Sequence, residues 1–102
     1  MVYNKLVRDK IPAIIENQGK IPCIRILEDE EYTLHLEQKL DEEVGEYHKD
    51  KTLEELADIL EVVYALAENL GCSKEDLINA YQKKHNERGG FSERILLISN
   101  EG

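Results

Sequence analysis

The sequence predicts a mainly α-helical bundle with a small two-stranded β-ribbon, folded as one domain over residues 1–102. Apolar residues recur every three to four positions along residues 30–48, 53–70 and 74–88, which is the helical period. Residues that start or stop helices separate these stretches. Only two short runs, both rich in β-branched residues, are typical of strands.

The composition is that of an ordinary globular protein with an acidic surface. Hydrophobic residues make up 41% and charged residues 34%, and the net charge is −9. That charge disfavours nucleic acid and anionic membranes as partners, although it suits a protein that holds metal cations. No apolar run approaches the roughly 20 residues that span a bilayer. Because no secretory signal opens the chain, we expect a cytoplasmic protein in which Cys23 and Cys72 are reduced and hold no zinc.

The first ten residues contain a basic group that is unusual in this acidic chain: Lys5, Arg8 and Lys10. Asp9 is expected to cap a short helix, with Pro12 in its first turn and Gly19 at its end. Two strand candidates follow, one at residues 22–27 and one at residues 94–99. They should pair with each other, and the ribbon should pack on the helices or extend across a subunit interface, because an isolated hairpin is marginally stable.

The helix expected at residues 30–48, with Asp29 as its cap, carries an acid inside its apolar stripe. The stripe consists of Leu36, Leu40, Val44 and Tyr47. Glu43 falls between Leu40 and Tyr47 in angle, Glu46 lies at the margin, and Glu42 lies just beyond it. A carboxylate is costly to bury unless it is paired or binds a metal, so Glu43 is the informative residue.

The helix expected at residues 53–70 is apolar around most of its circumference, which suits the centre of a bundle or an oligomer interface. Glu55 and Asp58 lie on or beside its apolar arc, whereas Glu61 lies on a solvent stripe. Thr52 and Glu55 also match a capping box, which is an alternative role for Glu55.

The helix expected at residues 74–88 begins at a Ser73 cap and ends in a basic group. The basic side chains are Lys83, Lys84, His85 and Arg88. They either complement the helix dipole or hold phosphate groups.

Two acid pairs at i, i+3 spacing, Glu43 with Glu46 and Glu55 with Asp58, each share a helical face. The linker at residues 47–52 is short, so the two helices should form an antiparallel hairpin in which the pairs face each other. Four converging carboxylates suit a hard cation such as Mg²⁺ better than zinc. The residues alone therefore predict a metal-dependent reaction on a phosphate ester or anhydride.

The motif Glu42-Glu43-Val-Gly-Glu46 followed by Glu55-Leu-Ala-Asp58 resembles the EExxE…ExxD signature of the MazG superfamily of all-α nucleoside triphosphate pyrophosphatases. The resemblance extends over nearly the full chain to a phosphoribosyl-ATP pyrophosphohydrolase-like branch, described as house-cleaning enzymes. Its marks are the segments 3–12 and 54–62 and the motif Arg88-Gly-Gly-Phe91.

The resemblance implies a MazG-like helical bundle that hydrolyses the α–β phosphoanhydride of a nucleoside triphosphate, canonical or damaged, to the monophosphate and pyrophosphate. Four residues match the ligands of Mg²⁺, with Mn²⁺ as an alternative ion: Glu43, Glu46, Glu55 and Asp58. Glu42 matches a leading acid that orients a ligand or the attacking water, so Glu42 and Glu43 are the expected catalytic pair. The matching substrate-binding residues are Lys83, Lys84, Asn86 and Arg88.

Relatives of this kind complete their pockets with a partner subunit, so the resemblance also implies a homodimer or higher homo-oligomer. No Trp is present to stack on a base, and the candidates for that role are Tyr32, Tyr47, Tyr64 and Phe91. Two alternatives stay open. The substrate is phosphoribosyl-ATP or another pyrophosphate-linked nucleotide, or the chain is a non-catalytic acidic helical module that binds a basic protein.

Overall fold

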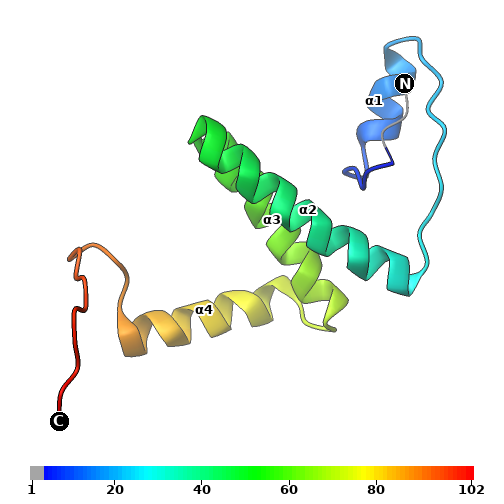
Figure 1. The fold of residues 1–102 in the computed structure, drawn as a ribbon. Helices are drawn as coiled ribbons and strands as arrows, with labels where there is room; N and C mark the ends of the chain where they lie inside the picture. The colour runs from blue at the N-terminus through cyan, green and yellow to red at the C-terminus, as the bar shows by residue number, and fades with distance from the viewer. Residues whose placement is uncertain (1–3) are drawn as a thin grey trace.

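The computed structural model describes residues 4–102, so Tyr3 of the opening motif lies outside the described residues. The described residues form four helices: α1 (Ile11–Asn17), α2 (Asp29–Asp50), α3 (Leu53–Asn69) and α4 (Lys74–Arg88). Figure 1 shows them in chain order. The prediction of a mainly helical protein is confirmed, and α3 and α4 match the expected ranges to within one residue.

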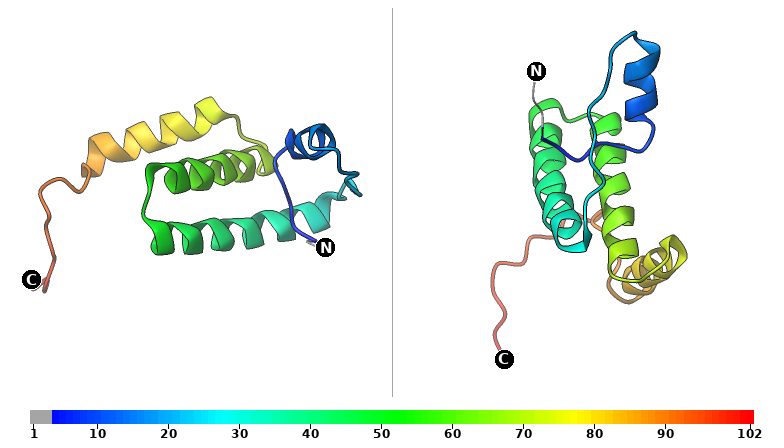
Figure 2. Two further views of the ribbon diagram at one scale, coloured as in Figure 1. Left: turned by 90° about the horizontal axis from the view of Figure 1, so that it is seen from above. Right: turned by 90° about the vertical axis from the view of Figure 1, so that its right-hand side faces the viewer.

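The centre of the molecule is an antiparallel hairpin of α2 and α3, as predicted (Figure 2). Lys51 ends α2 in the left-handed conformation, with φ of 52°. Thr52 begins α3, and its Oγ1 accepts a hydrogen bond from the Glu55 backbone N–H at 3.3 Å. Because only these two residues connect the helices, the C-terminal half of α2 must lie beside the N-terminal half of α3.

The buried core is small and comes from this hairpin. Leu36 of α2 is 2% exposed, and Val62 and Ala67 of α3 are each 7% exposed. At the open end of the hairpin, Asn69 Nδ2 donates a hydrogen bond to Thr33 Oγ1 at 2.9 Å. The hairpin therefore has an apolar centre, with a two-residue connection at one end and a side-chain hydrogen bond between the helices at the other.

The fourth helix packs only on α3 among the helices. Its N-terminus has the predicted cap, in which the Ser73 side chain accepts from the Asp76 N–H and the Asp76 carboxylate accepts from the Ser73 N–H. The other two predicted caps are wrong. The cap positions of α1 and α2 are Lys10 and Glu28, and neither side chain makes a capping hydrogen bond.

The predicted β-ribbon is not present in residues 4–102, where no strand is formed. Both candidate segments, at residues 22–27 and 94–99, are irregular, and they lie at opposite ends of the molecule (Figures 1 and 2). The reason is the direction of α4, which carries the second segment away from the first. Arg25 instead forms two hydrogen bonds of 2.9 Å with the carboxylate of Glu31 at the start of α2.

The chain is elongated and leaves many apolar side chains uncovered. Its radius of gyration is 18.0 Å, against about 13 Å for a compact domain of this length. Ile21 is 96% exposed, Phe91 is 98% exposed, and Leu53, Leu70 and residues 95–98 are also largely exposed. Within the described part of the chain, no helix is long and apolar enough to cross a membrane.

Candidate functional site

The hairpin brings the four predicted ligand residues into two carboxylate groups that share Glu55. Carboxylate oxygens of Glu43, Glu55 and Asp58 lie within 4.8 Å of one another. A second group, Glu46, Asp50 and Glu55, meets the same distance. Glu55 belongs to both groups, so we call these five residues the acidic site.

Asp50 was not predicted as a site residue. It is the last residue of α2 and follows Glu46 by four positions, which places both on one helical face. The i, i+4 spacing of Glu46 and Asp50 could therefore have identified Asp50 as a site residue from the sequence.

Glu43 has the position that the apolar stripe of α2 predicts. Its side chain is 13% exposed, and its carboxylate lies 3.4 Å from Lys39 Nζ, one turn earlier on the same helix. Asp58 is 42% exposed by comparison. The acidic site therefore has one sheltered wall, formed by Glu43, and an open side toward solvent.

Glu55 is the residue of the site with the most acidic neighbours. Partial desolvation raises the pKa of its carboxyl, and the negative charges of Asp50, Asp58, Glu46 and Glu43 raise it further. Within residues 4–102, no ion pair within 4.0 Å involves Glu55. The Glu55 side chain is not used in capping either, because only the Thr52 half of the predicted capping box forms.

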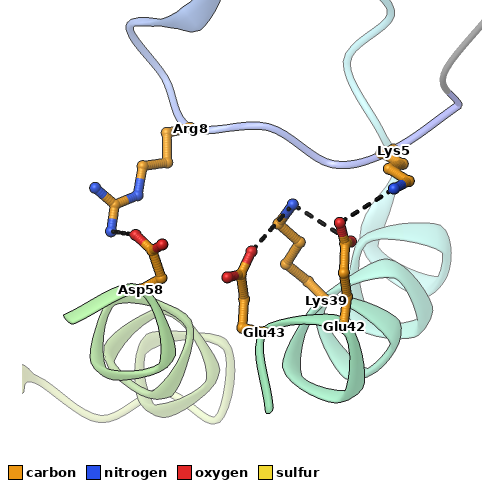
Figure 3. A network of polar contacts seen from close by, with 6 residues as sticks. All are labelled: Lys5, Arg8, Lys39, Glu42, Glu43 and Asp58. Carbon is orange, nitrogen blue, oxygen red and sulfur yellow. Dashed lines mark hydrogen bonds and ion pairs between the residues drawn. The ribbon is translucent and has the colours of Figure 1, made fainter. Parts of the chain in front are cut away.

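Glu42 stands beside Glu43 on α2, and its carboxylate contacts two lysines (Figure 3). Lys5 Nζ lies 3.1 Å from Glu42 Oε1, and Lys39 Nζ lies 3.4 Å from Glu42 Oε2. Partial burial opposes ionisation of Glu42, but the hydrogen bonds and charges of the two lysines outweigh it, so its pKa is lowered. Lys39 thus links Glu42 to Glu43.

The segment before α1 passes over Asp58 and Glu43, with Arg8 and Lys5 directed toward α3 and α2 (Figure 3). Arg8 Nη2 lies 3.2 Å from Asp58 Oδ1. The site assignment from sequence did not include Lys5, Arg8 or Lys39. The basic group in the first ten residues was the available signal, but periodicity says nothing of where an irregular segment runs.

The predicted substrate-binding residues, Lys83, Lys84, Asn86 and Arg88, are not brought to the acidic site. All four are exposed on the last turns of α4. Within the described residues, none of the three cations forms an ion pair, and the Asn86 Oδ1 accepts a hydrogen bond from Gln82 Nε2 at 3.2 Å. Arg88 lies in the last turn, where a positive charge complements the helix dipole.

A surface pocket of about 240 Å³ adjoins the acidic site. Its lining residues are Arg8, Ala57, Leu60, Glu61, Tyr64 and Lys74. Arg8 belongs to both places, since it lines the pocket and pairs with Asp58. Lys74 Nζ lies 4.8 Å from the centre of the Tyr64 ring.

The donor atoms of the acidic site suit Mg²⁺ or Mn²⁺. All are carboxylate oxygens, which are the hard ligands that these ions prefer, and neither group includes His or Cys. Desolvation raises the pKa of Glu55, and its four acidic neighbours raise it further, so negative charge gathers around this carboxylate. A divalent ion would supply positive charge there.

One comparison with known proteins gives a similar sequence. An uncharacterized protein of Mycolicibacterium smegmatis (strain ATCC 700084 / mc(2)155) is 55% identical to this chain over 42 residues, which are 41% of the chain and 43% of that relative. The matched stretch thus spans less than half of either protein. No family model and no solved structure matches the chain.

Proposed function

We propose that this chain is a Mg²⁺-dependent nucleoside triphosphate pyrophosphohydrolase with a MazG-like helical core. The observation that carries the proposal is the convergence of Glu43, Glu55 and Asp58 from two facing helices to within 4.8 Å. The reaction adds the oxygen of water to the α-phosphorus and breaks the bond from that phosphorus to the bridging oxygen. Its products are the nucleoside monophosphate and pyrophosphate.

Glu43, Glu46, Glu55 and Asp58 would hold Mg²⁺ or Mn²⁺, with Asp50 as an additional donor. When bound, the ion neutralises phosphate charge and lowers the pKa of a bound water. Glu42 acts as a positioning residue in this proposal. It holds Lys39, whose ammonium also contacts Glu43, and so fixes the carboxylate of Glu43 in the sheltered wall.

The exposed apolar surface supports a homo-oligomer, and we propose a homodimer as its smallest form. Leu53 and Leu56 of α3 are 79% and 45% exposed. Such a face on the central helix is typical of a subunit interface. The basic end of α4, with Lys83, Lys84, Asn86 and Arg88, is then available to contact phosphates in a partner's site.

The acidic-module alternative fits the structure less well. A surface that recruits a basic protein keeps its acids in solvent, whereas Glu43 is 13% exposed and already paired with Lys39. The phosphoribosyl-ATP alternative keeps the same metal site and differs only in the substrate.

The test is pyrophosphate release across a panel of canonical, damaged and phosphoribosyl nucleotides, with and without Mg²⁺. We expect Mg²⁺-dependent release that Glu55→Gln abolishes. Glu54→Gln is the matched control, because Glu54 is the exposed neighbour of Glu55 in the same helical turn and lies in neither carboxylate group. Full activity of Glu55→Gln, or release that does not depend on the metal, would refute the proposed function.

A further inference from the structure

The pocket beside Asp58 brings two cations together in an acidic protein. Arg8 comes from the segment before α1, and Lys74 is the first residue of α4. They are far apart in the sequence, yet both line the same pocket of about 240 Å³. The remaining lining is one acid, Glu61, and the less polar residues Ala57, Leu60 and Tyr64.

Arg8 connects this pocket with the acidic site. Its guanidinium lies 3.2 Å from Asp58 Oδ1, and its side chain is 53% exposed, so it can turn without breaking a packed core. The segment that carries it is tied to the hairpin by a second ion pair, between Lys5 and Glu42 at 3.1 Å. α1 itself does not pack against the other helices. The two ion pairs therefore hold residues 4–10, which we call the arm, over Glu42 and Asp58.

We propose that the pocket lined by Arg8, Tyr64 and Lys74 binds a phosphate group of the substrate, and that Arg8 exchanges Asp58 for that phosphate when the metal binds. This inference rests on the proposed function, and it names residues that hold the departing end of the polyphosphate. A divalent ion and a guanidinium compete for the carboxylate of Asp58, since both are stabilised by its negative charge. Release of Arg8 then leaves a planar donor that matches phosphate oxygens.

The position of the pocket fits the polyphosphate chain. Asp58 connects the acidic site with the pocket, because it groups with Glu43 and Glu55 and also pairs with Arg8, which lines the pocket. A polyphosphate that begins at the metal and passes Asp58 therefore reaches Arg8 and Lys74. Glu61 opposes anion binding in the same pocket. Removal of its charge should therefore strengthen phosphate binding, whereas removal of either cation should weaken it.

The experiment measures binding by calorimetry, first of Mn²⁺ alone and then of inorganic pyrophosphate in saturating Mn²⁺. For Arg8→Gln we expect Mn²⁺ to bind about two- to fivefold more tightly, because the ion no longer competes with Arg8 for Asp58. This factor corresponds to the energy of one exposed ion pair. Pyrophosphate should bind on the order of tenfold more weakly, because a charge-assisted contact is lost. Lys74→Gln should weaken pyrophosphate without changing the affinity for Mn²⁺, and Glu61→Gln should tighten pyrophosphate.

Two controls separate this role from a merely structural one. Lys10→Gln removes an exposed cation from the same arm that forms no ion pair within 4.0 Å in residues 4–102, and it should change neither affinity. Arg8→Lys keeps the charge and should retain part of the affinity for pyrophosphate. If Arg8 only ordered the arm, Arg8→Gln would leave the affinity for Mn²⁺ unchanged or weaken it.

The failures of the two proposals are distinguishable. If the wild-type protein binds Mn²⁺ and pyrophosphate but Arg8→Gln and Lys74→Gln bind pyrophosphate equally well, the pocket assignment is overturned and the proposed function stands. If the wild-type protein binds no Mn²⁺, both are overturned.

Discussion

The substitution Glu55→Gln tests the charge balance of the acidic site without changing the shape of the side chain. Glu55 has four acidic neighbours and no ion pair within 4.0 Å in residues 4–102, and its pKa is raised. An acid whose pKa is raised by folding binds more protons in the folded state than in the unfolded state. Its ionisation therefore destabilises the metal-free fold as pH rises from the ordinary value of 4.5 through the raised pKa.

The metal-free variant should accordingly melt at a higher temperature than the wild type at neutral pH. That advantage should vanish below the ordinary pKa of glutamate, where the wild-type side chain is also protonated in both states. Glu54→Gln is the control at each pH, because Glu54 occupies the same first turn and has the same helix-dipole environment.

Added Mg²⁺ should reverse the order of the two proteins. At a concentration one hundred times its Kd, a ligand that binds only the folded state stabilises it by about 2.7 kcal/mol. For a domain of this length that corresponds to a rise in Tm of about 10–20 °C. If loss of the shared ligand weakens the Kd about a hundredfold, the variant retains less than about a fifth of this gain.

The assay is thermal unfolding followed by circular dichroism from pH 4 to pH 8, with and without Mg²⁺. A metal-free Glu55→Gln protein that is less stable than the wild type at neutral pH would refute the charge argument. An undiminished Mg²⁺-induced rise in Tm would refute the role of Glu55 as a ligand.

Three further predictions concern the hairpin and the assembly. Glu42 has a lowered pKa, so its ionised side chain stabilises the fold above pH 4.5, and this contribution is lost as pH falls through the lowered value. Glu42→Gln should therefore lower the Tm by more at pH 7 than at acidic pH, and an equal loss at both would contradict this. Lys51→Gly should raise the free energy of unfolding by about 1 kcal/mol in urea titrations, because Lys51 has φ of 52° and glycine adopts this left-handed conformation without strain. A decrease would show that the Lys51 side chain is needed. Sedimentation velocity at tens of micromolar should show a dimer or larger species, since Leu53 and Phe91 are 79% and 98% exposed, and a monomer would count against the proposed interface.

The sequence predicted the hairpin and the approach of its acids because both depend on local information. The i, i+3 spacing fixes a shared face, and a short polar linker leaves few arrangements other than an antiparallel one. Apolar periodicity also placed Glu43 in the packing face, where it is 13% exposed. The i, i+4 spacing from Glu46 could have identified Asp50 in the same way, but the end of α2 was predicted two residues too early, which left Asp50 outside the helix.

The errors concern features that depend on the path of the chain between distant segments. The β-ribbon required residues 22–27 and 94–99 to meet, and the direction of α4 keeps them apart. Arg8 and Lys5 reach the site through an irregular segment whose course no periodicity describes. The basic residues at the end of α4 stay a prediction for phosphate binding, and periodicity gave no reason to add Arg8 and Lys74, which line the pocket.

The most direct test of the central claim is a titration of the metal-free protein with Mn²⁺, followed by the loss of the free-ion signal in electron paramagnetic resonance. We expect saturable binding to the wild type and to Glu54→Gln, with greatly weakened binding to Glu55→Gln, because Glu55 belongs to both carboxylate groups. Equal binding by all three proteins, or no saturable binding by the wild type, would contradict a metal site between α2 and α3.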